Sequence, residues 1–314
     1  MSFVFVFPGQ GSQSVGMLAA LAAAQPVVRT TFEEAARVLG YDLWALVSEG
    51  PEAALNATER TQPAMLAAGV ATWRAWRERG GAPPAAVSGH SLGEFTALVC
   101  AGSLEFGAAV DLVRFRGAAM QAAVPEGGGA MAAILGLDDE AVLALCREAA
   151  RDGVVEPVNY NSPGQVVIAG DTAAVQRALE AARTRGAKRA VTLPVSVPAH
   201  SSLMRTAGDR LRSRLADIEV RAPGIRYVSA VDAAAHEDPE EIRALLVRQL
   251  SSPVRWTQTL RALCGADVAQ VIECGPGRVL TGLNRRIERR EGLSFLALED
   301  PQSLAAALAA TRGT

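Results

Sequence analysis

Short apolar runs alternate along most of the chain with longer segments of helical periodicity. The helical segment from Thr31 to Leu39, for example, opens on the capping-box spacing Thr31-x-x-Glu34 and closes at Gly40. Strands that alternate with helices predict an α/β fold with a largely parallel sheet. The runs with the length and composition of buried strands are Phe3 to Phe7, Ala85 to Ser88, Ile225 to Ala230, Val268 to Glu273 and Leu293 to Leu298.

The middle third of the chain has a different order of elements. It begins after the glycine-rich joint at residues 125–129, and its order, strand-helix-strand-strand-helix-strand, matches a ferredoxin-like unit. We therefore predict a small domain, residues 126–196, inserted into a larger α/β domain made of residues 1–125 and 197–314. A functional site is expected in the cleft between them. The predicted strands are 131–136, 154–158, 165–169 and 189–193, and the helices are 139–150 and 172–185.

Composition and charge narrow the classes of function. The chain has 314 residues, of which 49% are hydrophobic and 20% are charged, as in a globular protein of about two domains. Its 31 basic and 33 acidic residues give a net charge of −2, so the broad basic field of a nucleic-acid-binding protein is missing. No apolar run approaches the roughly 18 to 20 residues that cross a bilayer, and the N-terminus lacks a basic signal-peptide region.

The cysteines predict a reducing compartment and no metal site. Each stands alone in an apolar segment, with no C-x-x-C pair and no histidine at ligand spacing. We expect buried, reduced thiols in a cytoplasmic protein. The positions concerned are Cys100, Cys146, Cys264 and Cys274.

A candidate nucleophile lies in the segment Gly89-His90-Ser91-Leu92-Gly93. An apolar run precedes it and a helical segment follows, which is the strand-turn-helix context of a nucleophile elbow. Glycines on both sides of Ser91 allow the strained turn that presents its hydroxyl at the start of the helix. The five-residue motif alone is also compatible with an ordinary glycine turn, and its context favours the elbow.

A serine hydroxyl needs a base at neutral pH, and the chain has three histidines. His90 neighbours Ser91, so its side chain should diverge from the hydroxyl, although it can line the same pocket. His236 lies in a segment typical of a solvated loop. His200, which follows Pro198, is left as the best base. No acidic third member of a triad is evident, and a backbone carbonyl could hold His200 instead.

The predicted first strand runs into the glycine-rich turn Pro8-Gly-Gln-Gly-Ser12. The dinucleotide-binding pattern G-x-G-x-x-G fails here because Ser14 occupies the third glycine position. An open turn at a strand end can instead bring Gln10 and backbone N–H groups beside the elbow.

These segments together resemble malonyl-CoA:acyl carrier protein transacylases and the related acyltransferases of polyketide synthases. The resemblance runs nearly end to end and implies an α/β-hydrolase-like large subdomain with an inserted ferredoxin-like small subdomain. It is carried by residues 7–13 (FPGQGSQ), 89–94 (GHSLGE), 116–117 (RG), 159–170 (NYNSPGQVVIAG), 197–201 (VPAHS), Gln249, 253–256 (PVRW) and 275–282 (GPGRVLTG).

The resemblance also implies a role for each residue of the site. Ser91 would be the nucleophile and His200 the general base and acid. Gln10 and the Leu92 N–H would form the oxyanion hole. Gln249 would lie at the back of the site, where its main chain can orient His200.

Recognition of the acyl group is implied in the same way. Arg116 would pair with the free malonyl carboxylate, while Asn159 and Asn161 would line the cleft from the small domain. Leu92 is the residue that malonyl-using members tend to have after the nucleophile. Ala199 departs from the hydroxyl residue common before the histidine in free-standing members.

The implied activity is transfer of a malonyl group from malonyl-CoA to the phosphopantetheine thiol of an acyl carrier protein, or of a polyketide synthase carrier domain, through a malonyl-serine. The implied protein is a monomer without metal or cofactor, since its substrates carry CoA and phosphopantetheine. Fatty-acid and polyketide pathways both remain open. The alternatives are a hydrolase that edits carrier-bound acyl groups and a catalytically idle carrier-docking module.

Overall fold

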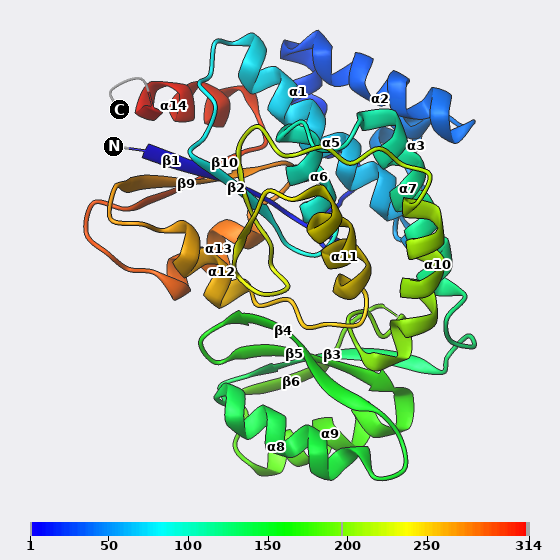
Figure 1. Ribbon diagram of the computed structural model, residues 1–314. Helices are drawn as coiled ribbons and strands as arrows, with labels where there is room; N and C mark the ends of the chain where they lie inside the picture. Colours follow the sequence, from blue (N-terminus) through cyan, green and yellow to red (C-terminus); the bar gives the residue numbers. More distant parts are fainter. Residues whose placement is uncertain (1, 196, 312–314) are drawn as a thin grey trace.

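Two β-sheets organise the computed structural model, which describes residues 2–195 and 197–311 (Figure 1). Within these residues, the larger sheet has the strand order β10 (Ser294–Leu298), β9 (Val268–Cys274), β1 (Ser2–Phe7), β2 (Ala86–Gly89), β7 (Arg226–Val228) and β8 (Ala235–His236). The smaller sheet has the order β4 (Val155–Ser162), β5 (Gln165–Asp171), β3 (Gly129–Leu135) and β6 (Arg189–Thr192).

Strand direction differs between the sheets. Neighbours from β10 to β7 pair in parallel, and only the short β8, among the described strands of the larger sheet, runs antiparallel. The smaller sheet is antiparallel throughout its described strands. The predicted α/β fold is thereby confirmed.

Helices cover both faces of the larger sheet. The buried residues of β1 point alternately to the two faces and are apolar on both, so both faces have to be covered. Val4 and Val6 pack with the helices α12 (Trp256–Leu263) and α13 (Val279–Ile287). Phe3, Phe5 and Phe7 face the other way, into the main core. The elements on that side are α1 (Ala19–Ala24), α2 (Pro26–Leu39), α3 (Leu43–Glu49), α4 (Glu52–Leu55), α5 (Thr58–Glu78), α6 (Gly93–Cys100), α7 (Phe106–Gln121), the 3-10 turn η1 (Ser202–Met204), α10 (Arg205–Leu215), α11 (Pro239–Gln249) and α14 (Pro301–Thr311).

The smaller sheet has one face covered by helices and one face turned toward the larger part. Ala132 and Ile134 of β3 pack with α8 (Asp139–Ala150) and α9 (Thr172–Thr184), which lie outermost in Figure 1. Met131 and Ala133 alternate with them and lie on the opposite face. This second face is free to form one wall of a cleft.

The element order of the middle third agrees with the predicted ferredoxin-like unit, and α8 has the predicted bounds. We propose the sequence-based division into segments 1–125, 126–196 and 197–314 for the two subdomains. The positions 1, 196 and 312–314, which include three ends of these segments, lie outside the described residues.

Two local predictions were wrong. Helix α2 begins at Pro26, five positions before the predicted start, because proline is well suited to the first turn of a helix. Thr31 therefore lies inside the helix, where its hydroxyl donates to the Val27 carbonyl instead of capping. His236 lies in β8 and not in a solvated loop. Its ring lies between the carboxylates of Asp232 and Glu241.

A backbone bridge joins the small subdomain to the C-terminal part of the chain. The Val254 N–H donates to the Val158 carbonyl (2.8 Å), and the Tyr160 N–H donates to the Val254 carbonyl (2.9 Å). Asn159 and Val254 thus form an isolated parallel bridge at β4. The position of β4 is fixed relative to the segment that follows α11.

In the described part of the chain, no helix combines the length and apolar character needed to cross a membrane. All four cysteines are buried and free. No cluster of three or more histidine, cysteine, aspartate or glutamate side chains suited to a metal ion occurs among the described residues.

Candidate active site

A sharp turn between β2 and α6 presents Ser91 to the cleft. Its φ is +52°, a left-handed conformation unusual for serine. A Cβ atom on Gly89 would lie 1.9 Å from the Gly93 carbonyl carbon, and one on Gly93 would lie 2.1 Å from the Phe7 carbonyl oxygen. Only glycine fits these two positions, so the sequence on both sides of the serine produces the predicted elbow.

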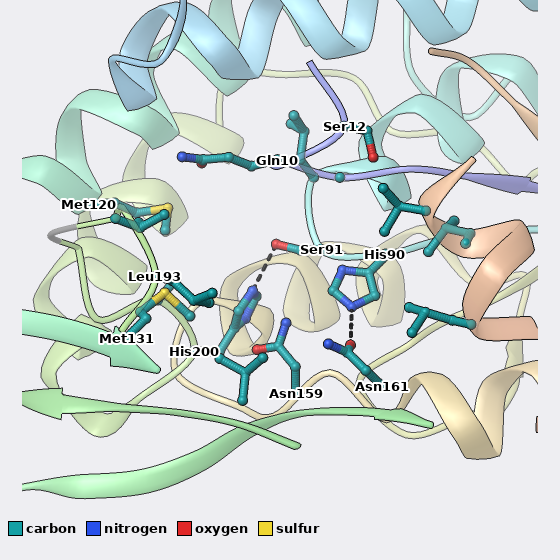
Figure 2. Close-up of a pocket in the computed structure, with 18 of the residues that line it drawn as sticks. Gln10, Ser12, His90, Ser91, Met120, Met131, Asn159, Asn161, Leu193 and His200 are labelled. Atoms are coloured by element: carbon teal, nitrogen blue, oxygen red, sulfur yellow. Dashed lines mark hydrogen bonds between the residues drawn. The ribbon is translucent and has the colours of Figure 1, made fainter. Parts of the chain in front are cut away.

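Ser91 and His200 form a hydrogen-bonded pair, shown in Figure 2. The distance from Ser91 Oγ to His200 Nε2 is 2.8 Å, and His200 Nδ1 lies 2.7 Å from the main-chain carbonyl oxygen of Gln249. Because a carbonyl only accepts, Nδ1 carries the proton and the Nε2 lone pair faces the serine hydroxyl. The backbone carbonyl takes the place of the third member of a triad.

Burial and the nearby charge of Arg116 lower the pKa of His200 to about 3. A lowered pKa means that the neutral form, which accepts a proton, persists to a lower pH than in an ordinary histidine. His200 is therefore neutral and able to accept a proton throughout the neutral pH range. The same low pKa makes it a weaker base than an ordinary histidine.

The low pKa of His200 predicts a reaction rate that does not depend on pH below neutrality. The kcat/KM for acylation of Ser91, which reports the ionisation of groups in the free enzyme, should not fall between about pH 8 and pH 5, since His200 stays neutral there. Stopped-flow or quenched loading at fixed ionic strength measures it. A one-proton fall centred near pH 6.5, the ordinary histidine value, would contradict this assignment.

Arg116 is a fully buried cation, 1% exposed, that lines the pocket. Its Nη1 donates to Gln62 Oε1 (2.9 Å), and its Nη2 donates to Gln249 Oε1 (2.8 Å) and, at 3.3 Å, to Ser91 Oγ. Among the described residues, its Nε has no hydrogen-bond partner. Burial lowers its pKa to about 10, so the guanidinium remains charged at neutral pH.

The surroundings of Arg116 hold it in place without neutralising it. None of its protein hydrogen bonds in the described structure is to a carboxylate. A buried charge is costly when it is unpaired, and a guanidinium is shaped to bind a carboxylate with two parallel hydrogen bonds. The site is therefore suited to a substrate that brings its own negative charge next to Ser91.

Gln10 and Leu92 lie at the pocket from two neighbouring strand ends. Gln10 follows β1, and Leu92 is the N-cap residue of α6. The first N–H groups of a helix have no partner within the helix, and they form the positive end of its dipole. Both residues line the same pocket as Ser91, which makes them candidates to bind an oxyanion there.

The small subdomain contributes two asparagines from β4. Asn161 Oδ1 lies 2.8 Å from His90 Nε2, so the residue before the nucleophile is bonded across the cleft. Burial lowers the pKa of His90 and keeps its ring neutral. The Asn159 Oδ1 is buried and, in the described structure, accepts no hydrogen bond, which leaves it available to a ligand in the pocket.

The remaining lining of the pocket is mainly apolar. Met120, Met131 and Leu193 lie on one side of the Ser91–His200 pair, and His90 and Asn161 lie on the other (Figure 2). Val279, Leu280 and Leu283 of α13 also line the pocket. Apolar walls next to the serine reduce the access of water.

The structure brings the predicted site residues together. Eight of them line the pocket, and Gln249 lies behind it, 1% exposed, in contact with Arg116 and His200. Two buried residues of the site, Gln62 and Glu94, were not predicted from the sequence; Gln62 bonds Arg116 and Glu94 bonds Gln249. The eight lining residues are Gln10, His90, Ser91, Leu92, Arg116, Asn159, Asn161 and His200.

Comparisons with known proteins agree with this geometry. The acyl transferase domain model matches residues 4–291. The chain is 54% identical over 306 residues, 98% of each chain, to the malonyl CoA-acyl carrier protein transacylase of Escherichia coli K12. A solved acyl carrier protein S-malonyltransferase from Vibrio cholerae is 54% identical, with a TM-score of 0.94 over 98% of this chain and 100% of that one.

A further solved structure contains a malonyl-transacylase in complex with its acyl carrier protein of a type II polyketide synthase. It is 54% identical to this chain, with a TM-score of 0.97 over 99% of this chain and 100% of that one.

Proposed function

Because the chain belongs to the malonyl-CoA:acyl carrier protein transacylase family, we propose that it moves a malonyl group from malonyl-CoA to the phosphopantetheine thiol of an acyl carrier protein. The observation that carries this proposal is the position of the Arg116 guanidinium, 3.3 Å from the hydroxyl of a serine that is bonded to a neutral histidine. A cation so close to the nucleophile supports the pairing of Arg116 with the free carboxylate of a malonyl group.

The first half-reaction acylates Ser91. His200 Nε2 takes the hydroxyl proton while Oγ attacks the thioester carbonyl, and Gln10 and the Leu92 N–H bind the negative oxygen of the tetrahedral intermediate. The Gln249 carbonyl stabilises the imidazolium that forms. The intermediate then releases CoA thiolate, which takes the proton from His200, and malonyl-Ser91 remains.

The second half-reaction uses the same groups in the same order. His200 accepts the proton of the phosphopantetheine thiol, whose sulfur attacks the malonyl ester. The Ser91 oxygen leaves and recovers a proton from His200. One thioester replaces another, so the exchange is close to thermoneutral, and the apolar lining has to keep water from the ester while the carrier protein arrives.

Substrate binding should also raise the basicity of His200. The charge of Arg116 is one cause of the low pKa of the histidine, second to burial. A malonyl carboxylate paired with Arg116 would offset that charge and raise the pKa toward its ordinary value. An uncharged acyl group cannot do this, so recognition and activation of the base are coupled.

One experiment tests the function against its alternatives. The protein is mixed with malonyl-CoA and holo carrier protein, and intact masses are recorded over time. Transfer gives a malonyl adduct on the carrier. The hydrolase alternative gives free malonate with an unmodified carrier, and an idle docking module gives neither product.

Arg116→Ala is expected to change substrate choice as well as rate. Malonyl loading should fall by about 10²-fold, the usual effect of removing one partner of a buried charge pair, while acetyl loading should gain relative to malonyl. Arg116→Lys should recover only part of the loss, since an ammonium cannot bond Gln62, Gln249 and a carboxylate in the same planar geometry.

Competition between malonyl-CoA and acetyl-CoA, read as the two adduct masses, measures the preference. Arg114→Ala is the matched control, because Arg114 lies two positions away on the exposed face of α7, paired with Asp111. If Arg116→Ala keeps the parental preference for malonyl, Arg116 has only a structural role.

The partner is an acyl carrier protein, and we propose that the chain acts on it as a monomer in the cytoplasm, with no resident metal or cofactor. Every residue of the proposed mechanism comes from one chain, and both acyl carriers bring their own thiol. The free, buried cysteines fit a reducing compartment.

A further inference from the structure

Glu94 is a buried carboxylate that takes no direct part in the proposed mechanism. It is 1% exposed in the first turn of α6, three positions after the nucleophile. Its Oε1 accepts hydrogen bonds from the Tyr227 hydroxyl (2.7 Å) and the Ala230 N–H (2.9 Å), and its Oε2 accepts one from Gln249 Nε2. Burial raises the pKa of Glu94, and these three hydrogen bonds oppose that effect because they stabilise the ionised carboxylate, the form that only accepts.

The side-chain amide of Gln249 lies between Glu94 and Arg116. One amide hydrogen goes to Glu94 and the other to the main-chain carbonyl of Ser91 (3.0 Å). Its oxygen is then left to face the Arg116 Nη2, 2.8 Å away. A rotated amide would place its NH2 group against a cation, so the Ser91 carbonyl and the Glu94 carboxylate select the orientation of Gln249 that holds Arg116.

The same carboxylate supplies negative charge close to the buried guanidinium. Burial alone disfavours the charged form of Arg116, and the charge of Glu94 opposes that effect. The two side chains do not touch, since Gln249 separates them. Arg116 is therefore supported electrostatically without losing its capacity to bind a substrate carboxylate.

We propose that Glu94 is a positioning residue, which fixes the side chain of Gln249 so that Arg116 stays aligned for the carboxylate of the acyl group. This inference rests on the proposed malonyl transfer. Glu94 acts only through Gln249: the contact from Gln249 to His200 is made by the main-chain carbonyl, while the contact to Arg116 is made by the side chain.

Glu94→Gln tests the proposal with almost no change in volume. A glutamine at position 94 has one oxygen and one NH2 group in place of two oxygens. The Ala230 N–H can only donate, so the side-chain oxygen of the new glutamine has to stay on that side. The new amide should therefore turn its NH2 to Gln249, whose amide then rotates and presents NH2 to Arg116. Malonyl loading should fall by about 10- to 100-fold, the usual worth of a hydrogen bond to a charged group, and acetyl loading should fall much less.

The ratio of the malonyl loading rate to the acetyl loading rate distinguishes a positioning role of Glu94 from a loss of folded protein. A variant that is only less well folded loses active molecules, which lowers both rates by the same factor and leaves the ratio unchanged. Tyr227→Phe is the matched control: it removes another hydrogen bond of the Glu94 carboxylate and leaves the contact with Gln249. We expect Tyr227→Phe to keep the parental ratio.

Gln249→Met provides a second test that does not depend on the folding of the first variant. Methionine has a similar length and no amide, and the main-chain carbonyl that holds His200 is retained. The ratio should fall as in Glu94→Gln, and adding Glu94→Gln to Gln249→Met should lower it no further.

An unchanged ratio in Glu94→Gln or in Gln249→Met would overturn the role of Glu94, as would a fall in Tyr227→Phe as large as that in Glu94→Gln. The parent protein is loaded in the same assay. If the parent forms no malonyl-serine, the proposed function fails instead, so the two failures are distinguishable.

Discussion

Ser91→Ala is expected to abolish the covalent malonyl adduct completely. The change removes the one oxygen that attacks the thioester, and no other described hydroxyl is bonded to His200 Nε2. Alanine tolerates the backbone of the elbow as well as serine does, and the lost atom faces the pocket and not the core. The thermal midpoint of the variant should therefore stay close to that of the parent.

Intact-mass measurement after incubation with malonyl-CoA, followed by peptide mapping, checks this result. Ser12→Ala is the matched control, since Ser12 also lines the pocket and has no role in the mechanism (Figure 2). It should form the adduct normally. A malonyl group trapped on Ser12, or on any residue of the Ser91→Ala variant, would show that the nucleophile is a different one.

His200→Ala should slow both half-reactions by roughly 10²- to 10⁴-fold, the usual contribution of a positioned general base. Without the ring, neither the serine hydroxyl nor the incoming thiol has a proton acceptor. The variant also leaves the Gln249 carbonyl without its donor. Rapid-quench loading with malonyl-CoA gives the first rate, and steady-state transfer to the carrier gives the second.

Added imidazole should restore part of the lost rate, because it can enter the space that the ring occupied. His236→Ala is the control histidine, since its ring lies between Asp232 and Glu241 outside the pocket lining. An acylation rate that His200→Ala leaves unchanged would assign the base to another group.

The alternation of strands and helices was predictable because β-strands and helices in this chain differ clearly in length and period. The elbow was predictable for a second reason: its two glycines have no steric alternative. His200 could be found by elimination among three histidines. The strands and the elbow depend on residues close together in the sequence. The assignment of His200 depends on the need of a serine nucleophile for a base.

The buried polar network behind the pocket could not be predicted in the same way. Arg114 and Arg116 look alike in the sequence, yet one is exposed and paired with Asp111 while the other is buried behind the nucleophile. An acid such as Glu94 in a first helical turn is common on protein surfaces. Gln62 lies on α5, far from every motif. The family resemblance singled out Arg116, but the burial of Arg116, Glu94 and Gln62 follows only from the packing of α5, α6, α7 and α11.

The backbone bridge at Val254 limits how this enzyme can be engineered. The ferredoxin-like unit is one continuous segment, so an exchange between relatives requires only two junctions in the chain. Its strand β4, however, shares backbone hydrogen bonds with Val254, five positions beyond the residue whose carbonyl holds the catalytic base. A chimera joined only at the two ends of the ferredoxin-like unit would pair β4 of one relative with residue 254 of the other. A working chimera therefore has to keep the recipient's own β4 edge, or has to take residues 253–255 from the same relative as the unit.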